Sequence, residues 1–329
     1  MSHSNISIFI PHAGCEHNCI FCNQHIISGA EKPPTAVEVK AEIKTAISKL
    51  KNPENTEIAF FGGSFTCLPD EYMTSLLAVA WEAVRLHNLA GIRISTRPDA
   101  ITPDILDTLE SFGVTAIELG AQSMSDEVLR LNRRGHTALD VVKAVALIKE
   151  RFEFGLQMMT GMYGSNADTD MKTAKAIAKL APDTVRIYPT VVIKGTELEK
   201  VWEQTTSLDE MVSIVAAMVS LFETENIRII RVGLHASETL EADITGGYYH
   251  PAFGELVENE IFFRLITEKL TKKGAYIIYV HPKNISKAIG QKSKNITKLS
   301  LSGYDITVRP DETLTGRREI RAKHEHIKE

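Results

Sequence analysis

The sequence predicts an α/β fold followed by a small α+β module at the C-terminal end. Short β-rich apolar runs alternate with amphipathic helical stretches over most of the first 235 residues, the order expected of a parallel sheet with crossover helices. A Gly-rich, aromatic stretch, GGYYHPAFGELVEN, then marks a change of organisation. With 329 residues, 43% of them apolar, the chain is long enough for one large core and a small appendage.

The first part of the chain contains six strand-helix units. We expect strands at residues 6–11, 57–61, 91–96, 115–119, 154–159 and 184–189. Helices are expected at residues 36–50, 71–87, 103–112, 139–151 and 168–180. Pro103 is well placed for the first turn of its helix. Six units suit an open six-unit barrel or a doubly wound sheet, and periodicity does not separate the two.

The second part begins with a further helix and strand, at residues 208–225 and 227–232, and we place a boundary near Pro251. Beyond it we expect a helix at 255–272, a strand at 276–281, two helices around Gly290, a strand at 304–308 and a frayed helix from Arg317 to Glu329. The predicted domains are therefore residues 1–257 and 258–329.

Charge is uneven along the chain. From Glu260 to the end there are 15 Lys and Arg against 8 Asp and Glu, a net charge of +7, whereas the rest carries −12. A basic segment is often only a solvated face, but it indicates nucleic-acid binding more strongly if it contains a nucleic-acid motif. The first ten residues lack a signal-peptide pattern, and no apolar run approaches bilayer length. We therefore expect a soluble cytoplasmic protein with no membrane partner.

Three of the four cysteines lie within the segment PHAGCEHNCIFCNQ, directly after the first strand. Cys15, Cys19 and Cys22 follow C-x3-C-x2-C spacing, on a loop at the expected active face of an α/β fold. Three thiolates on a four-iron, four-sulfur cluster leave one iron open to a small molecule, as a catalytic cluster requires. Such crowding suits metal binding in a reducing compartment better than a disulfide framework.

Other interpretations of the cysteines stay open. A zinc site would add His12, His17 or His25, although closed structural zinc sites usually bring two ligand pairs from separate turns. Three thiols in eight residues rarely serve packing alone. The remaining cysteine, Cys67, is isolated behind GGSFT and is interpreted as a small buried hydrophobe, with a reactive thiol as the alternative.

Several motifs in one order resemble the radical S-adenosylmethionine superfamily. They are CEHNCIFC, FFGGSF after the second strand, GAQS after the fourth, and RIYPTVVIKGTELE at the sixth. Within it, the sequence resembles the radical domain of the Elongator catalytic subunit and, more distantly, coproporphyrinogen dehydrogenase. The likeness covers about residues 5–257, because VGLHASETLEADITGGYYHPAFGELVEN resembles that family's extension beyond the barrel. It implies a partial (β/α)6 TIM-like barrel.

The resemblance also implies the cofactors. A [4Fe-4S] cluster would be held by Cys15, Cys19 and Cys22, which are then metal ligands and catalytic residues at once. S-adenosyl-L-methionine would chelate the open iron through its amino and carboxylate groups. An electron from a donor of the reduced flavodoxin or ferredoxin type would break its sulfur-carbon bond, and the resulting 5′-deoxyadenosyl radical would take hydrogen from a substrate.

Further residues match cofactor-binding positions of that family. A glycine pair lets the backbone approach the methionine ammonium, and polar or cationic positions face the ribose and carboxylate. The matching residues are Gly62, Gly63, Gln122, Arg134 and Gln157. Arg133 competes with Arg134 for the cationic position. Without the resemblance, an arginine pair at a helix end would indicate a solvated face.

Substrate-side residues are implied around the sixth strand. The family places substrate-side or cofactor-side groups at the positions of Arg186, Tyr188 and Lys194. Three polar residues of undefined role close the third strand on the same expected face: Thr96, Arg97 and Asp99.

The basic segment YIIYVHPKNISKAIGQKSKNITKLSLSGYDITVRP resembles the minimal core of a KH module. Such a module lays single-stranded nucleic acid over a G-x-x-G turn between two helices, helped by helix dipoles and lysines. The resemblance implies contacts to RNA by Gly290, Lys287, Lys292, Lys294 and Lys298. Ser293 departs from the pattern, because it stands where the second glycine is expected. The alternative is an appendage that packs on the barrel or mediates dimerisation.

Three functions follow from these patterns. The first is a radical enzyme that modifies RNA, with a transfer-RNA base and wobble uridine indicated by the Elongator likeness. That relative carries an additional acetyltransferase domain, for which we expect no room in this chain, so an acetyl-CoA-dependent reaction is not implied. The second is a radical oxidoreductase that acts on a small metabolite such as a porphyrinogen. The third is a non-catalytic iron-sulfur protein that binds RNA.

Overall fold

The chain forms two compact units in a computed structural model that describes residues 4–11, 13–15, 19–23, 26, 32–234 and 238–325. The first unit consists of Met1–Thr205 and Leu221–Tyr249, and the second of Thr206–Ser220 and His250–Glu329. Each unit thus draws on two segments, whereas the predicted domains are continuous. The division into residues 1–257 and 258–329 stays a prediction.

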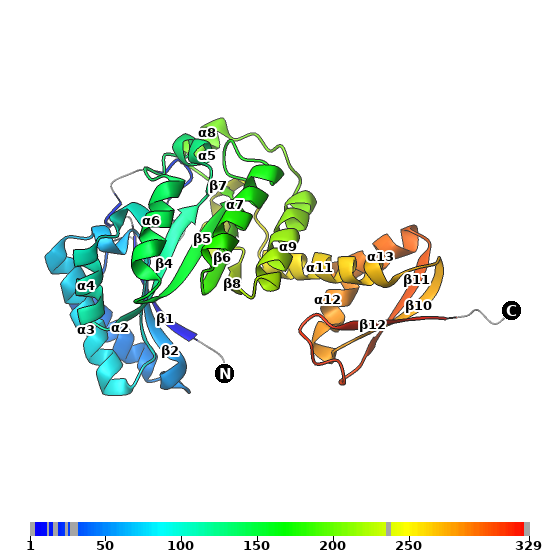
Figure 1. The fold of residues 1–329 in the computed structure, drawn as a ribbon, viewed down its shortest axis with the longest axis horizontal. Coiled ribbons are helices and arrows are strands. Elements are labelled where there is room, and N and C mark those ends of the chain that lie inside the picture. The colour runs from blue at the N-terminus through cyan, green and yellow to red at the C-terminus, as the bar shows by residue number, and fades with distance from the viewer. Residues whose placement is uncertain are drawn as a thin grey trace. The chain divides into compact units, whose positions relative to one another are not determined.

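A seven-stranded parallel sheet lies at the centre of the first unit (Figure 1). Its strands, in spatial order, are β1 (Ser4–Ile10), β2 (Thr56–Gly62), β3 (Gly91–Thr96), β4 (Val114–Gln122), β5 (Glu153–Thr160), β6 (Thr184–Pro189) and β8 (Arg228–Val232). The spatial order equals the sequence order, without the reversal that defines a doubly wound sheet. With β1 and β8 at its edges, the sheet is an open, partial barrel, which confirms the predicted fold class.

Helices connect these strands and cover one face of the sheet (Figure 1). They are α2 (Ala36–Ile47), α3 (Asp70–His87), α4 (Pro103–Ser111), α5 (Asp126–Leu131), α6 (Ala138–Ile148) and α7 (Ala167–Leu180). Local sequence explains where they begin: Thr35 and Thr137 form capping boxes with Glu38 and Asp140, and Pro103 opens α4 as predicted.

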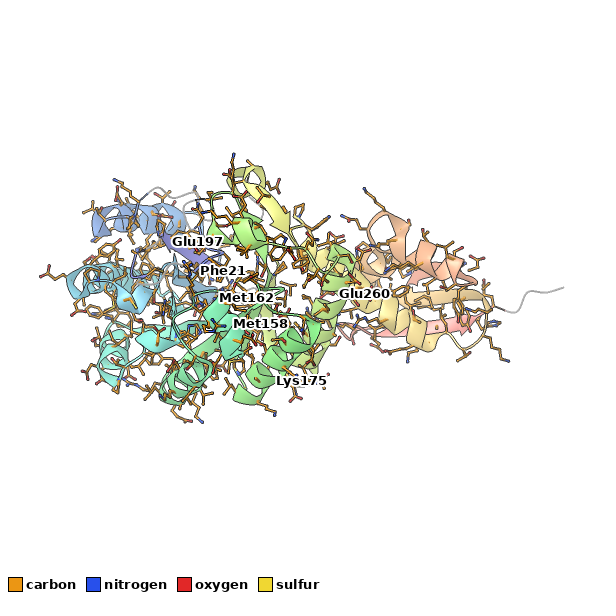
Figure 2. The ribbon with its side chains drawn as sticks, turned by 90° about the horizontal axis from the view of Figure 1, so that it is seen from above. Phe21, Met158, Met162, Lys175, Glu197 and Glu260 are labelled. Atoms are coloured by element: carbon orange, nitrogen blue, oxygen red, sulfur yellow. The ribbon has the colours of Figure 1, made fainter. Side chains whose placement is uncertain are left out.

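The two faces of the sheet differ in polarity. Ile117 and Leu119 of β4 are buried on the helix-covered face, and Glu118 between them points to the opposite, concave face because strand residues alternate. Figure 2 shows buried Met158 and Met162 inside this unit, where β5 leads toward α7. The carboxyl ends of the parallel strands therefore share one edge, next to a polar concave face.

A small antiparallel ribbon, absent from the sequence-based prediction, completes the first unit. It pairs β7 (Val191–Ile193) with β9 (Ile244–Gly247), and two short helices flank it, α8 (Glu197–Val201) and α10 (Glu238–Ala242). Within the described ranges, no helix is long and apolar enough to cross a bilayer.

The second unit contains the predicted strand-helix-turn-helix-strand order. Its elements are α11 (Phe253–Lys269), β10 (Gly274–Val280), α12 (Ile285–Ile289), α13 (Lys294–Leu301), β11 (Tyr304–Pro310) and β12 (Ile320–His324), together with the first part of α9 (Leu208–Thr224). The sheet order is β11-β10-β12, with β10 parallel to β11. Phe262, Ile278 and Leu299 belong to the core between the sheet and the helices.

The frayed helix expected at residues 317–329 is wrong. Residues Ile320–His324 form β12, which pairs antiparallel with β10. Ile320 and Ala322 pack against the core, whereas Arg321 and Lys323, which alternate with them, are exposed. Apolar and basic residues thus alternate with the period of a strand, and charge content alone hides this pattern.

Candidate functional site

The cysteine loop after β1 is seated on the end of β2. The Gly63 N–H donates to the Ile10 carbonyl at 2.8 Å, and the Ser64 N–H donates to the Ala13 carbonyl at 3.2 Å. A Cβ atom on Gly63 would lie 2.0 Å from the Ala13 carbonyl oxygen, so only glycine permits this approach. The predicted pair, Gly62 and Gly63, therefore positions the loop, and its contact with a methionine ammonium stays a prediction.

Arg134 links the cysteine loop to the end of β4. Its Nη1 donates to Cys19 Sγ at 3.2 Å, and its Nη2 donates to the Gly120 carbonyl at 2.8 Å. Its neighbour Arg133 is exposed and pairs with Glu197 at 2.7 Å. The structure thus separates the two competing arginines, and Arg134 is the one that lies at the cysteines.

Gln122 and Gln157 meet beside this arginine. The Gln157 Nε2 donates to the Gln122 Oε1 at 3.2 Å, which joins the last residue of β4 to the middle of β5. Gln122 is buried and Gln157 half-buried. A Cβ on Gly120 would lie 2.8 Å from Gln122 Nε2 and 3.3 Å from Arg134 Nη2. Arg134, Gln122 and Gln157, which were predicted as cofactor-binding residues, thus lie close together beside β4 and β5.

Burial and neighbouring charges act in opposite directions on the pKa of Cys15, and burial has the larger effect. Burial raises the pKa of the Cys15 thiol, and the neighbouring Cys19 raises it as well. The Ser64 backbone and the guanidinium groups of Arg134 and Arg97 act in the opposite direction. These cationic neighbours favour the thiolate, which is the form that binds metal.

The closing residues of β3 support the same region. Thr96 Oγ1 lies 2.9 Å from Ser64 Oγ and 2.6 Å from Thr66 Oγ1, so hydroxyl groups join β3 to the segment after β2. Arg97 and Asp99 form a two-point ion pair with distances of 3.0 and 2.6 Å. Thr96 thus forms hydrogen bonds near the cysteine loop, and Arg97 and Asp99 bind each other directly after β3.

Cys67 belongs to this neighbourhood as well. It is half-buried, and Ser64 Oγ donates to its Sγ at 3.4 Å. The interpretation of Cys67 as a small buried hydrophobe is therefore wrong about its burial. A hydroxyl partner and partial exposure distinguish Cys67 from an inert packing residue.

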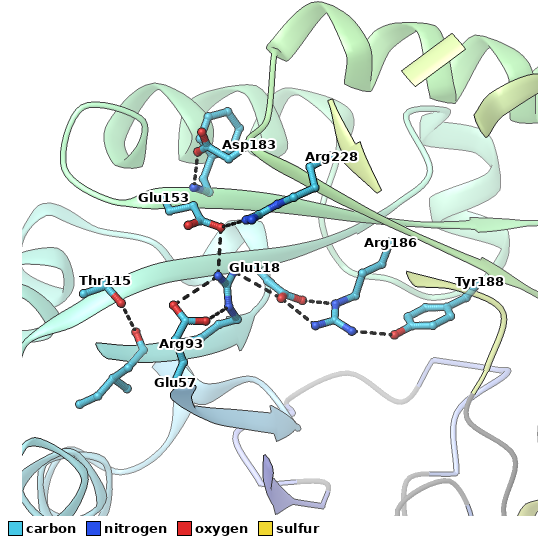
Figure 3. A network of polar contacts seen from close by, with 11 residues as sticks. Glu57, Arg93, Thr115, Glu118, Glu153, Asp183, Arg186, Tyr188 and Arg228 are labelled. Atoms are coloured by element: carbon cyan, nitrogen blue, oxygen red, sulfur yellow. Dashed lines mark hydrogen bonds and ion pairs between the residues drawn. The ribbon is translucent and has the colours of Figure 1, made fainter. Parts of the chain in front are cut away.

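A network of buried ion pairs crosses the concave face of the sheet (Figure 3). Arg93 of β3 is 2% exposed and contacts Glu57 at 2.7 Å, Glu153 at 3.0 Å and Glu118 at 3.5 Å. Glu118 also accepts hydrogen bonds from Arg186 at 2.6 and 2.9 Å. Each arginine thus has acidic partners, which limits the cost of burying its charge.

The predicted substrate residues have different environments. Arg186 is committed to Glu118, packs over the Phe61 ring at 5.2 Å, and places Nη1 3.5 Å from the Tyr188 hydroxyl. Arg186 is also the register partner of Gln157, so this pair continues the polar surface from the Gln122 edge. Lys194 is exposed after β7. A substrate role of these residues stays a prediction.

The turn of the second unit adopts an unusual backbone. Gly290 has φ 80°, and Lys292 and Ser293 have φ 53° and 59°, in the left-handed region that favours glycine. Ser293, which stands where the pattern has a glycine, therefore adopts a backbone conformation that favours glycine. Three of the predicted lysines are paired: Lys294 with Asp209 at 2.6 Å, Lys287 with Glu258 at 3.3 Å and Lys298 with Glu260 at 3.9 Å.

The donor set fits an iron-sulfur cluster. Thiols on one loop are the ligands such clusters use, and Arg134 donates to one of those sulfurs. In the described part of the chain, no three His, Cys, Asp or Glu side chains are arranged to hold a metal ion, so cluster binding stays a prediction. His12, His17 and His25 of the zinc alternative lie outside the described residues.

Sequence reasoning missed the buried charges and the histidine behind Gln122. Arg93 and Glu118 each interrupt an apolar strand, in GIRIST and IELGAQ, and such an interruption is a usable signal because an unpaired buried charge is costly. His136, in the segment RRGHT, is buried and contacts the Ala121 carbonyl at 3.1 Å. Nothing in the local pattern indicates that contact.

Comparisons with known proteins agree with this geometry. A model of the Radical SAM superfamily matches residues 9–177, and one of the Radical_SAM C-terminal domain matches residues 182–262. The tRNA uridine(34) acetyltransferase of Methanocaldococcus infernus is 28% identical in an alignment of 241 positions, which covers 60% of this chain and 45% of that protein. The chain thus spans less than half the length of this curated relative.

Two solved structures share the fold. Elp3 from Methanocaldococcus infernus matches with a TM-score of 0.65 and 23% identity, over 82% of this chain and 64% of that chain. HemN, the coproporphyrinogen III oxidase of Escherichia coli, matches with a TM-score of 0.52 and 18% identity, over 68% and 53% of the two chains.

Proposed function

Because the chain belongs to the radical SAM superfamily, we propose that it uses a [4Fe-4S] cluster and S-adenosyl-L-methionine to modify a base of transfer RNA. The two family models confirm the resemblance inferred from the cysteine motif and the assignment to a superfamily of enzymes. The cofactors, the reaction and the RNA substrate are the parts that we propose.

Cys15, Cys19 and Cys22 would hold the cluster. The observation that carries this proposal is the hydrogen bond from buried Arg134 to Cys19 Sγ at 3.2 Å, beside the Gln122–Gln157 pair. A cationic donor against a sulfur stabilises the negative charge of thiolate ligands. When bound, the cluster would supply one electron for the reductive cleavage of S-adenosyl-L-methionine.

The residues at the strand ends would bind and orient the cofactor. Arg134 has further N–H groups with which to contact a carboxylate, and the amides of Gln122 and Gln157 suit the hydroxyl groups of a ribose. Gly63 brings the loop backbone close to the end of β2. Holding the reactants together in this way removes much of the entropic cost of reaction.

The proposed substrate is a uridine of transfer RNA, with the wobble position as the first candidate. This choice follows the name of the Methanocaldococcus infernus relative, tRNA uridine(34) acetyltransferase. The basic second unit, with its glycine-containing turn, would contact RNA phosphates. A reduced flavodoxin or ferredoxin would donate the electron.

The test is anaerobic reconstitution with iron and sulfide, followed by reduction in the presence of S-adenosyl-L-methionine. We expect 5′-deoxyadenosine in all reactions and a modified base only when total transfer RNA is added. A modified porphyrinogen or another small metabolite in RNA-free extract would instead support the oxidoreductase alternative. A cluster that never yields 5′-deoxyadenosine would contradict an enzymatic role and support an RNA-binding protein.

A further inference from the structure

Strand β4 ends in a strained turn at Gln122. The Ser123 N–H donates to the Ala121 carbonyl at 2.7 Å, and Gln122 between them has φ 61°. The pairing of β4 with β5 shifts register between Gly120 and Gln122. A left-handed backbone at a residue other than glycine is energetically costly and persists only where the surroundings hold it.

A hydrogen bond from His136 stabilises this turn. Its Nε2 lies 3.1 Å from the Ala121 carbonyl oxygen, the same oxygen that closes the turn. Because a carbonyl only accepts hydrogen bonds, Nε2 carries a proton, and in the neutral imidazole Nδ1 then carries none. The side chain is 4% exposed, and Nδ1 has no partner among the residues that the structure describes.

The protonation state of His136 agrees with this contact. Burial, followed by the neighbouring Arg134 guanidinium, lowers the pKa of His136 to about 4. The imidazole is therefore neutral at physiological pH, with its single N–H directed at the Ala121 carbonyl. A neutral donor avoids placing a second buried cation beside Arg134.

Arg134 and His136 together hold two consecutive carbonyls of β4. Arg134 Nη2 donates to the Gly120 carbonyl at 2.8 Å, and His136 donates to that of Ala121. The space above Gly120 is filled by the Gln122 amide, since a Cβ there would lie 2.8 Å from Nε2. The backbone and the side chain of Gln122 are thus constrained from two sides.

We infer that His136 is a positioning residue for S-adenosyl-L-methionine: its hydrogen bond to the Ala121 carbonyl locks the left-handed turn that presents the Gln122 amide to the cofactor. This inference rests on the proposed function, because Gln122 is placed in the cofactor pocket there. His136 touches no reacting atom, and it acts through the backbone of its neighbour.

The test compares three variants of the full chain. His136→Leu removes the donor, His136→Gln keeps an N–H that can reach the carbonyl, and Val141→Ala is a control that loosens buried packing in α6. One readout is hydrogen-deuterium exchange at the Ser123 amide in protein without cofactors. The other is the dissociation constant of S-adenosyl-L-methionine for anaerobically reconstituted protein.

We expect His136→Leu to speed exchange at Ser123 and to weaken S-adenosyl-L-methionine binding by at least about fivefold, the loss expected when a buried carbonyl loses a donor. His136→Gln should restore both within about threefold, and Val141→Ala should change neither, although it lowers the unfolding midpoint. Unchanged exchange and affinity in His136→Leu would overturn the inference and leave the proposed function standing. If wild-type protein with a full cluster does not bind S-adenosyl-L-methionine, both are overturned.

Discussion

The Nη1 atom of Arg134 donates a hydrogen bond to Sγ of Cys19 across 3.2 Å, although 115 positions separate the two residues in the chain. The contact joins the loop after β1 to the segment after β4. A guanidinium beside a thiol lowers the energetic cost of the thiolate. The arginine therefore connects the expected cluster ligands with the residues that are expected to hold the cofactor.

Replacing Cys19 with alanine should abolish both cluster assembly and the cleavage of S-adenosyl-L-methionine, because two thiolates of one loop do not hold a four-iron centre. Iron and sulfide content after anaerobic reconstitution measures the first effect, and 5′-deoxyadenosine measures the second. Cys67→Ser is the matched control, since Cys67 lies near the same loop but outside the triplet. Full iron content in Cys19→Ala would contradict the ligand assignment.

Arg134→Lys should weaken binding of S-adenosyl-L-methionine by about tenfold or more, because an ammonium does not reproduce the fork that reaches both Cys19 and Gly120. Binding to reconstituted protein can be measured by equilibrium dialysis. Arg133→Lys should leave it unchanged, because Arg133 is exposed and pairs with Glu197. Equal losses in both variants would show that Arg134 has no special place at the site.

Glu118→Ala should lower the free energy of unfolding by about 3–5 kcal/mol, because it leaves Arg186 buried without its acidic partner. Urea denaturation of the variant and the wild type gives this difference. The exposed pair of Asp168 and Lys172 is the control, and Asp168→Ala should cost no more than about 1 kcal/mol. A small loss in Glu118→Ala would mean that water readily enters the concave face.

Asp170 makes stability depend on pH. Burial raises the pKa of Asp170 from 3.8 to about 6, and the Gly161 N–H that donates to it opposes this rise only in part. The folded state holds the proton on Asp170 more tightly than the unfolded state does. The contribution of Asp170 to the free energy of unfolding is therefore complete below about pH 4 and is lost as the pH rises through 6. The stability advantage of wild type over Asp170→Asn should therefore shrink by up to about 3 kcal/mol across that window. Urea titrations at several pH values measure it, and a constant difference would argue against a buried, titrating carboxyl.

His136 makes stability depend on pH in the opposite direction, because its pKa is lowered from 6.5 to about 4. The unfolded chain takes up the proton first, so this contribution is present above pH 6.5 and is lost as the pH falls toward 4. In His136→Gln the loss in this window should be absent. The same urea titrations apply, and an equal acid loss in variant and wild type would mean that His136 titrates normally.

RNA binding by the second unit should depend on which lysines are available. Lys292 has no ion-pair partner in the described part of the chain, whereas Lys294 pairs with Asp209 at 2.6 Å. Lys292→Ala should weaken binding of transfer RNA and reduce the salt slope by about one unit. Asp209→Asn should strengthen it by releasing Lys294. Filter binding at several salt concentrations gives both values, with Lys49→Ala as an exposed control; no change in either variant would exclude the turn as an RNA contact.

Features that depend on neighbouring residues were predictable from the sequence. The C-x3-C-x2-C triplet, the alternation of strands and helices, and the turn at Gly290 all arise within short segments, where spacing and periodicity carry the information. Periodicity did not decide the order of the strands, because it suits a barrel and a doubly wound sheet alike, and only the resemblance to the radical S-adenosylmethionine superfamily indicated the barrel. The alternation in β12 was also present in the sequence, but charge content concealed it.

Contacts between distant segments were decided only by the tertiary structure. Arg133 and Arg134 are equivalent in the sequence, yet the backbone after α5 turns one toward Glu197 and the other toward Cys19. Likewise, Glu118 gains Arg186 from a strand 68 positions away. The sequence by itself determined the fold class and the cysteine motif, whereas tertiary packing decided that Arg134, and not Arg133, lies at the cysteines. The physical reason is that a buried charge is tolerated only where a partner meets it, and the fold alone brings such partners together.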